Sequence, residues 1–155
     1  MAVVGVIRIE GASELERKLK QLEPKMSRKI VRKALRAGAR PIQQQEKANI
    51  PAVANREHPA GVWKRSIKIR SAKRSRRGDI GIVIQSRQED FEGENFYGPF
   101  VELGHKTGRR GSPMRRQVPG KHYIRKAFET KKGAATAIIS RELAAGIEAV
   151  ARERT

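Results

Sequence analysis

The stretch from Pro24 to Ile50 reads PKMSRKIVRKALRAGARPIQQQEKANI. Its apolar residues recur at helical spacing and continue a stripe that begins upstream. That stripe comprises Leu15, Leu19, Leu22, Met26 and Ile30. Pro24 fits the first turn of a helix better than a helix interior, so we predict a helical pair whose second member starts at Pro24. The second helix is predicted to kink at Pro41 and to end by Ile50, because a residue before proline resists the helical region.

Short β-branched segments flank this helical pair. Residues 3–9 (VVGVIRI) predict a strand, and Ser13 with Glu16 matches a capping box in which Ser13 is the N-cap. Residues 51–61 are rich in proline and small residues, which is typical of a loop. Segments 66–70 and 80–85 (IGIVIQ) predict two strands paired as a hairpin.

The C-terminal third combines a glycine-rich segment with a helix. Gly104 to Gly120 holds four glycines, two prolines and five Lys/Arg, so we expect an extended basic loop, or arm, without regular structure. From Tyr123 to about Arg152 the pattern is helical, although Gly133 and Gly146 weaken it. The predicted fold is α+β in a single domain, residues 1–155. A small, mainly antiparallel sheet of three or four strands is packed by the N-terminal helical pair and the C-terminal helix.

Aromatic residues concentrate just before the basic arm. Four of the chain's seven aromatics lie between Phe91 and Phe100, and residues 96–105 read FYGPFVELGH. An apolar block joined to a basic arm indicates a protein that docks against other components of an assembly. We expect Phe100 and Val101 to serve the core of the monomer. Trp63 is expected to be a hydrophobic plug on the sheet rather than an interface anchor.

The chain is strongly basic, with 35 Lys+Arg against 16 Asp+Glu and a net charge of +19. Such a charge favours nucleic acid, anionic membrane or acidic protein surfaces as partners. No apolar run is long enough for a transmembrane helix and no signal peptide is evident, so we expect no membrane partner and synthesis in a cytoplasm. A charged helix face is often simply solvated. Three basic clusters almost free of acids nevertheless predict contact with phosphates or an acidic surface. The candidate residues are Arg28, Arg32, Arg36, Arg40, Lys73, Arg74, Arg76 and Arg77.

Catalytic and cofactor sites are not indicated. The chain has no cysteine, and the glycine-rich arm lacks the P-loop pattern. Glu102 and His105 have the i, i+3 spacing of carboxylate metal sites, but one such pair without a second is usually structural. We expect no enzyme activity, no cofactor and no metal.

In order along the chain, these segments resemble a known family. The marks are a GxxEL helix start, a basic second helix ending at Asn-Ile-Pro, GVWKRSI, GIVI, YGPFVELGH and HYIRKAFE. They are similar to the tail-component family encoded among the neck and tail genes of long-tailed (siphovirus) phages, described as head–tail joining or tail-completion proteins.

The resemblance implies a virion structural protein of the neck or tail, present in the host cytoplasm during assembly. It implies a homo-oligomeric, hexameric ring whose partners are the head connector or adaptor, tail terminator or tail tube proteins, and phage DNA in the channel. The predicted interface residues are Phe96, Tyr97, Phe100, Lys106, Arg109, Arg110, Arg115 and Arg116. The alternatives are a tail terminator of the same neck and a non-specific nucleic-acid-binding protein, with a toxin or other small enzyme a weaker third.

Overall fold

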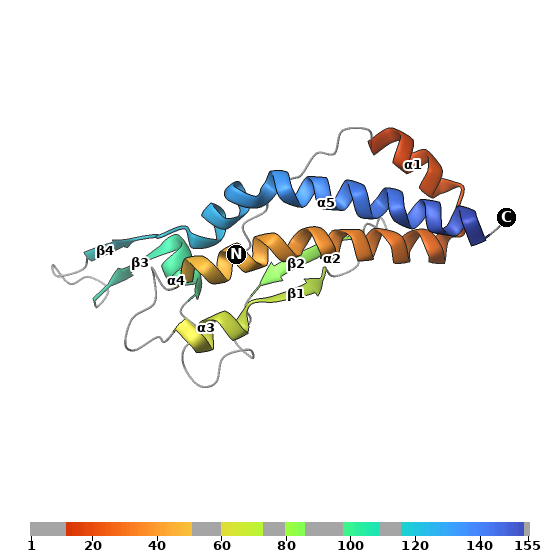
Figure 1. The fold of residues 1–155 in the computed structure, drawn as a ribbon. Coiled ribbons are helices and arrows are strands. Elements are labelled where there is room, and N and C mark those ends of the chain that lie inside the picture. The colour runs from red at the N-terminus through yellow and green to blue at the C-terminus, as the bar shows by residue number, and fades with distance from the viewer. Residues whose placement is uncertain (1–11, 51–59, 73–79, 86–97, 109–115, 154–155) are drawn as a thin grey trace.

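The fold is built around two long helices, α2 and α5, which run side by side in opposite directions (Figure 1). The computed structural model describes residues 12–50, 60–72, 80–85, 98–108 and 116–153. In chain order the elements are α1 (Ala12–Lys20), α2 (Pro24–Asn49), α3 (Ala60–Ser66), β1 (Lys68–Ser71), β2 (Ile82–Gln85), α4 (Gly98–Leu103), β3 (Gly104–Thr107), β4 (Arg116–Pro119) and α5 (Tyr123–Glu153). Helix α1 contacts both long helices, whereas β1 and β2 contact α2. Helix α2 is therefore the central element.

Close packing of α2 on α5 forms the main core. Ile30 and Ala34 of α2 are buried with Ile139 of α5 in a cluster that the leucines of the predicted upstream stripe also cover. Two glycines allow this approach: a Cβ at Gly146 would lie 2.6 Å from Ile30 Cγ2, and one at Gly38 would meet Ile139. Gly146 looked like a weak point of the helix in the sequence, but here it makes room for a partner side chain.

The predicted helix boundaries hold closely along α2. Pro24 lies in the first turn, the helix continues through Pro41, and its last α-helical residue is Asn49. The N-cap prediction for α1 was wrong, because Ser13 lies inside a helix that includes Ala12.

The predicted hairpin is confirmed, but the single sheet of three or four strands is not. Strands β1 and β2 pair antiparallel, with Ile69 opposite Ile84, while β3 and β4 form a separate two-stranded sheet. The two sheets contact different parts of the fold, since β1–β2 packs on α2 and β3 adjoins α4. The strand predicted for residues 3–9 lies outside the described residues.

Helix α3 was missed in the sequence. Ala60 was assigned to a loop and Ser66 to a strand, yet both belong to α3, and Ser66 Oγ donates a hydrogen bond to the Trp63 carbonyl at 2.7 Å. The helix brings Trp63 onto a second core cluster with Ile50 and Tyr123. Trp63 is 3% exposed, which confirms its interpretation as a core residue.

The prediction of an arm without regular structure from Gly104 to Gly120 was wrong, because strands β3 and β4 occupy both of its ends. Two glycines explain the result. Gly104 has a φ of 78°, and a Cβ there would clash with the Val118 carbonyl, while a Cβ at Gly120 would lie 2.7 Å from the Leu103 carbonyl carbon. The same glycines that suggest a loop allow the two chain segments to meet at the base of a hairpin.

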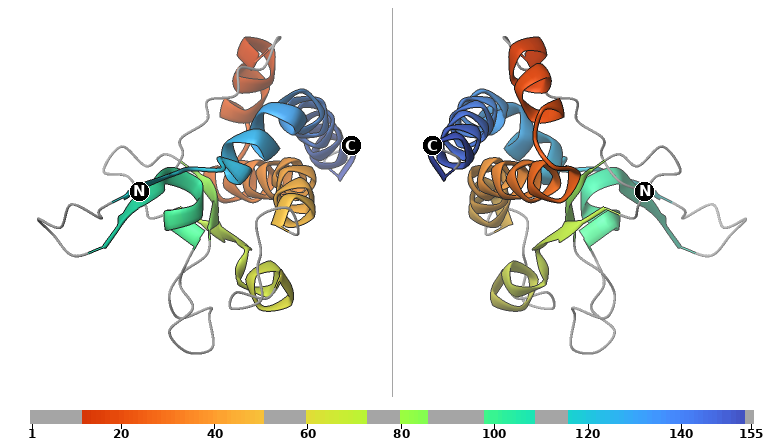
Figure 2. Two further views of the ribbon diagram at one scale, coloured as in Figure 1. Left: turned by 90° about the vertical axis from the view of Figure 1, so that its left-hand side faces the viewer. Right: turned by 90° about the vertical axis from the view of Figure 1, so that its right-hand side faces the viewer.

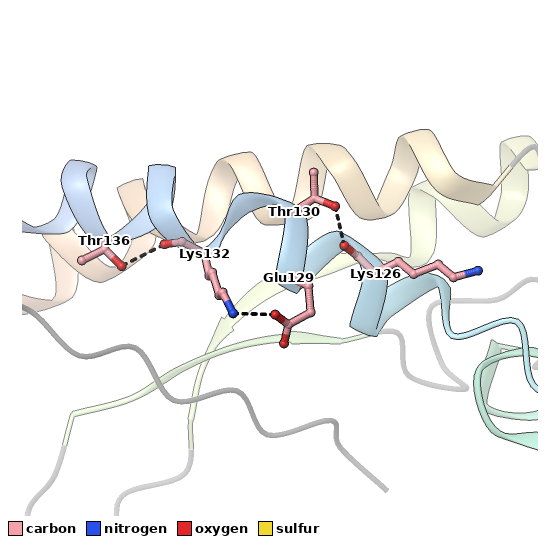
Figure 3. Close-up of polar contacts among 5 residues, drawn as sticks. All are labelled: Lys126, Glu129, Thr130, Lys132 and Thr136. Atoms are coloured by element: carbon pink, nitrogen blue, oxygen red, sulfur yellow. Dashed lines mark hydrogen bonds and ion pairs between the residues drawn. The ribbon is translucent and has the colours of Figure 1, made fainter.

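The predicted C-terminal helix is confirmed as α5, and its first turns run at an angle to the remainder (Figure 2). Near this bend Thr130 Oγ1 donates to the Lys126 carbonyl at 2.7 Å and Thr136 Oγ1 to the Lys132 carbonyl at 2.8 Å (Figure 3). Threonine bonds to the carbonyl four residues earlier often bend helices. In the same part of α5, the exposed side chains of Lys132 and Glu129 form an ion pair at 2.6 Å (Figure 3).

Two glycine substitutions test the α2–α5 contact. Gly38→Ala should destabilise the protein by about 1–3 kcal/mol, because its Cβ must displace Ile139 and lies 3.0 Å from the Ala135 carbonyl oxygen. Gly133→Ala, at an exposed α5 position with nothing within 4 Å, should instead stabilise it by about 0.5–1 kcal/mol. Urea unfolding of both variants measures the difference. Equal stability of the two would contradict the close approach.

Candidate functional site

The carboxylate of Glu102 joins α4 to the start of α5. Glu102 is 3% exposed, and its Oε2 and Oε1 accept the backbone N–H groups of Ile124 at 2.8 Å and Arg125 at 3.2 Å. These are N–H groups of the first turn, which have no partner inside the helix. The N-cap role, which usually belongs to the residue before the helix, is here filled by a residue about twenty positions upstream. A negative charge at this end also complements the helix dipole.

Backbone bonds reinforce the same junction. The N–H of Lys121 donates to the Val101 carbonyl at 2.7 Å, and that of His122 donates to the Glu102 carbonyl at 3.3 Å. His122 has a φ of 49°, and its carbonyl accepts the N–H of Lys126 at 2.9 Å. The chain thus turns through a left-handed residue to enter α5, while Glu102 supplies the capping side chain.

An aromatic pair lies beneath this junction. The Trp63 and Tyr123 rings meet edge to face with centroids 5.2 Å apart, and Trp63 Nε1–H donates to Tyr123 Oη at 3.2 Å. Burial raises the pKa of the Tyr123 hydroxyl, so it stays protonated and able to hydrogen-bond. Asn49 Nδ2 donates to the Tyr123 carbonyl at 3.0 Å, which ties the end of α2 to the start of α5.

A second carboxylate, that of Glu46 on α2, is buried nearby. Glu46 is 1% exposed, and its Oε2 has no hydrogen-bond partner among the described residues. Burial, with repulsion from the Glu102 charge, raises its pKa to about 7 from an ordinary 4.5. Sequence reasoning missed both roles: it treated Glu102 only as half of a metal pair and gave Glu46 no role.

Three apolar side chains are exposed beside the junction. Phe100 and Leu103 of α4 and Val118 of β4 are 48%, 46% and 38% exposed, respectively. The Phe100 ring packs edge to face on His105, with centroids 5.6 Å apart, and His105 pairs with Val118 across the β3–β4 ladder. Phe100 and Leu103 are one helical turn apart, so they share a face of α4. We call Phe100, Leu103 and Val118 the apolar patch.

The prediction that Phe100 serves the monomer core was therefore wrong. Its neighbour Val101 is partly buried and packs on the Trp63 cluster, because the two residues point to different sides of a short helix. Lys106 and Arg116 lie exposed on the β3–β4 hairpin, which extends away from the long helices in every view (Figures 1 and 2). The remaining predicted interface residues, outside the described part of the chain, are Phe96, Tyr97, Arg109, Arg110 and Arg115.

The arginines predicted on α2 come together along a groove of about 870 Å³. We call it the arginine groove; its lining comprises Lys25, Arg28, Lys29, Arg32, Lys33, Arg36, Ala37 and Arg40 of α2 with Ser71 of β1 and Glu142 of α5. Arg36 Nη2 donates to Ser71 Oγ at 3.4 Å, and Lys33 Nζ lies 3.7 Å from Glu142 Oε2. The lysines of this lining were not among the predicted site residues. The other predicted basic residues, Lys73, Arg74, Arg76 and Arg77, lie outside the described residues.

The same described segments contain neither a metal-binding cluster nor a membrane-spanning helix. No three His, Asp or Glu side chains there gather as a metal site would require, and Glu102 of the Glu102–His105 pair is occupied in capping α5. None of the described helices combines the length and apolar character needed to cross a bilayer.

Comparison with protein families identifies the chain. The family described as "Bacteriophage HK97-gp10, putative tail-component" matches residues 13–104, which is more than half of the sequence. The chain belongs to this family. Neither the curated proteins nor the solved structures that were compared gave a match.

Membership confirms the resemblance found in the sequence. The match runs from α1 to the first residue of β3, so it includes Glu102, Phe100 and the α2 side of the arginine groove. An HK97-gp10-like tail component is a structural protein of a bacteriophage and works in contact with other virion proteins. A family of this kind points to a non-enzymatic role.

Replacing the Glu102 carboxylate tests the junction of this HK97-gp10-like protein. Glu102→Ala should cost about 1–3 kcal/mol, because it removes the helix cap and leaves the partly buried N–H groups of Ile124 and Arg125 without their carboxylate acceptor. Urea unfolding measures the loss. Glu148→Ala, at an exposed α5 position, is the matched control and should change stability by less than about 0.5 kcal/mol. Similar small losses in both variants would contradict the capping role.

Titration of Glu46 predicts a pH dependence of stability. The folded state raises this pKa to about 7, so the unfolded chain loses the proton first and stability falls as pH rises from about 4.5 to about 7. Glu46→Gln should therefore be more stable than wild type by about 1–3 kcal/mol at pH 8, with the gain vanishing near pH 4.5. Thermal unfolding of both proteins across this range is the measurement. A difference that does not vary with pH would show that Glu46 is not titrating in the folded protein.

Proposed function

We propose that this tail component is a ring-forming head–tail joining, or tail-completion, protein of the phage neck. The observation that carries the proposal is the apolar patch, which α4 and β4 form at the base of a hairpin that extends from the helical body. Large exposed apolar side chains gathered at one place mark interaction sites. The Glu102 junction holds the base of this patch in a fixed position, so the patch is available to a neighbour without prior ordering.

The neighbour that we propose is a second copy of the same chain. The hairpin and the segment that joins its strands are basic, with Lys106, Arg116 and the arginines between them. The same chain carries an acidic segment at residues 89–94 (EDFEGE), which supplies the opposite charge. A surface of one copy that fits a different surface of the next makes a head-to-tail contact, and such contacts generate rings when the rotation closes.

Polar substitution of the patch separates assembly from folding. Phe100→Ser combined with Leu103→Ser should lower the melting temperature by several degrees but leave the protein folded at 25 °C, because both side chains are only about half buried and lie outside the two core clusters. It should abolish rings in light scattering and electron microscopy. Ala137→Ser with Ala145→Ser, at exposed positions on α5, is the control and should assemble normally. Rings formed by the patch variant would overturn the proposed interface.

A phage lysate lacking the protein tests the place in assembly. Head–tail joining predicts filled heads and tails of normal length that remain separate until wild-type protein is added back. Tails of irregular length would instead identify the alternative, a tail terminator. Fully joined particles in the absence of the protein would overturn both roles.

A further inference from the structure

We infer that the arginine groove binds the phosphate backbone of duplex DNA. The inference is independent of the ring and of the head–tail joining role, because the groove is formed within one copy of the chain. It rests on the spacing of the cations, on how few anions neutralise them, and on the chemistry of the groove lining.

The cations form two parallel rows along α2. Arg28, Arg32, Arg36 and Arg40 recur every four residues, and Lys25, Lys29 and Lys33 form the second row. Residues four apart rise about 6 Å along a helix, so the arginine row is about 18 Å long. Duplex DNA carries one charge per about 1.7 Å of its axis, so the two strands of a segment of this length carry about ten phosphates, of which those on one side would face the row.

The charge on this face is largely unneutralised, in contrast to α1. There, Lys18 and Lys20 pair with glutamates one turn earlier, at 2.8 Å and 2.7 Å, as on an ordinary solvated helix. Helix α2 contains one acid, Glu46, and that residue is buried away from solvent. Within the described lining of the groove, Glu142 is the sole carboxylate, and it lies 3.7 Å from a highly exposed Lys33. Like charges at this spacing repel one another. Binding of a polyanion is therefore favoured both by its attraction to the cations and by relief of their mutual repulsion.

The lining favours duplex DNA over an acidic protein or a single strand. Ala37 is the largest apolar side chain among the residues that line the groove, whereas protein interfaces depend on buried aromatic or large apolar anchors. The lining has no aromatic ring on which an unpaired base could stack. Arginine forks pair with phosphate oxygens in two-pronged geometry, and Ser71 adds a hydroxyl beside Arg36. Contacts of this kind do not depend on the base sequence of the DNA.

The experiment compares two variants of equal charge in the full-length protein. The groove variant carries Arg28→Gln, Arg32→Gln, Arg36→Gln and Arg40→Gln. The control carries Gln at four exposed arginines that do not line the groove: Arg17, Arg65, Arg125 and Arg152. Glutamine is close to arginine in helix propensity, and circular dichroism checks that both variants fold. Fluorescence anisotropy with 20-base-pair duplexes of two unrelated sequences measures affinity from 50 to 300 mM NaCl.

The groove variant should lose at least tenfold in affinity at 150 mM NaCl, and the slope of log K against log salt should fall by about 3–4, close to one per arginine. The control should lose less than about threefold, and both duplexes should behave alike. Equal losses in the two variants would overturn the inference, since binding would then follow net charge alone. Competition by polyglutamate or by a single strand of the same charge, as effective as that by duplex, would likewise overturn it in favour of an acidic protein or unpaired DNA.

A variant with lysine at the same four positions checks the inference if the glutamine variant fails to fold. Lysine keeps the charge but not the two-pronged geometry. This variant should keep the wild-type salt slope while binding several-fold more weakly. A salt slope well below that of the wild-type protein, or wild-type affinity, would contradict the assigned role of the arginine forks.

Discussion

The capping of α5 by Glu102 is the interaction on which the end of the molecule that carries α4 and the β3–β4 hairpin depends. A helix of this length begins with N–H groups that need acceptors, and the residue at its start, His122, presents an exposed side chain in a left-handed turn. The acceptors come instead from Glu102, buried at the end of α4. The same carboxylate therefore orders α5, fixes α4 beside it and sets the base of the β3–β4 hairpin. As a result, the apolar patch is held in a fixed position relative to α5.

The two faces of helix α2 have different roles, one in core packing and the other at the charged surface. One face packs against α5 so closely that Gly38 and Gly146 leave no space for a side chain, and this contact carries the core. The outward face carries rows of cations with little internal neutralisation. Burial of Glu46 near Glu102 adds a further cost, which protonation relieves. The helix is thus stabilised by packing and tolerates unfavourable charge at its surface and one end. Local rules of this kind are commonly broken at functional sites.

Membership in a phage tail-component family gives these surfaces a context. The apolar patch and the arginine groove differ in chemistry: one offers exposed aromatic and aliphatic side chains, and the other offers guanidinium groups with no large apolar neighbour. Surfaces so different suit different partners, a protein neighbour for the first and a polyanion for the second. The head–tail joining role that we propose would need more than one such surface.

Local patterns in the sequence were enough to predict helices α1, α2 and α5, the first hairpin and the family, because these depend on local periodicity, on proline positions and on the order of short motifs. Pro24 marked the start of α2, alternating isoleucines marked β1 and β2, and the recurring arginines marked the charged face. Tertiary structure alone decided the rest. Glycines at 104 and 120 are typical of a loop in the sequence, but in the fold they allow two segments to approach closely. Phe100 was predicted to be a core residue, but α4 exposes it and directs Val101 toward the Trp63 cluster. Glu102 could be seen as a cap only in space, since its partners at the start of α5 lie more than twenty residues away. Local sequence patterns indicate which secondary structure a segment favours. Only the packed fold decides which distant group supplies a hydrogen-bond acceptor or a packing partner.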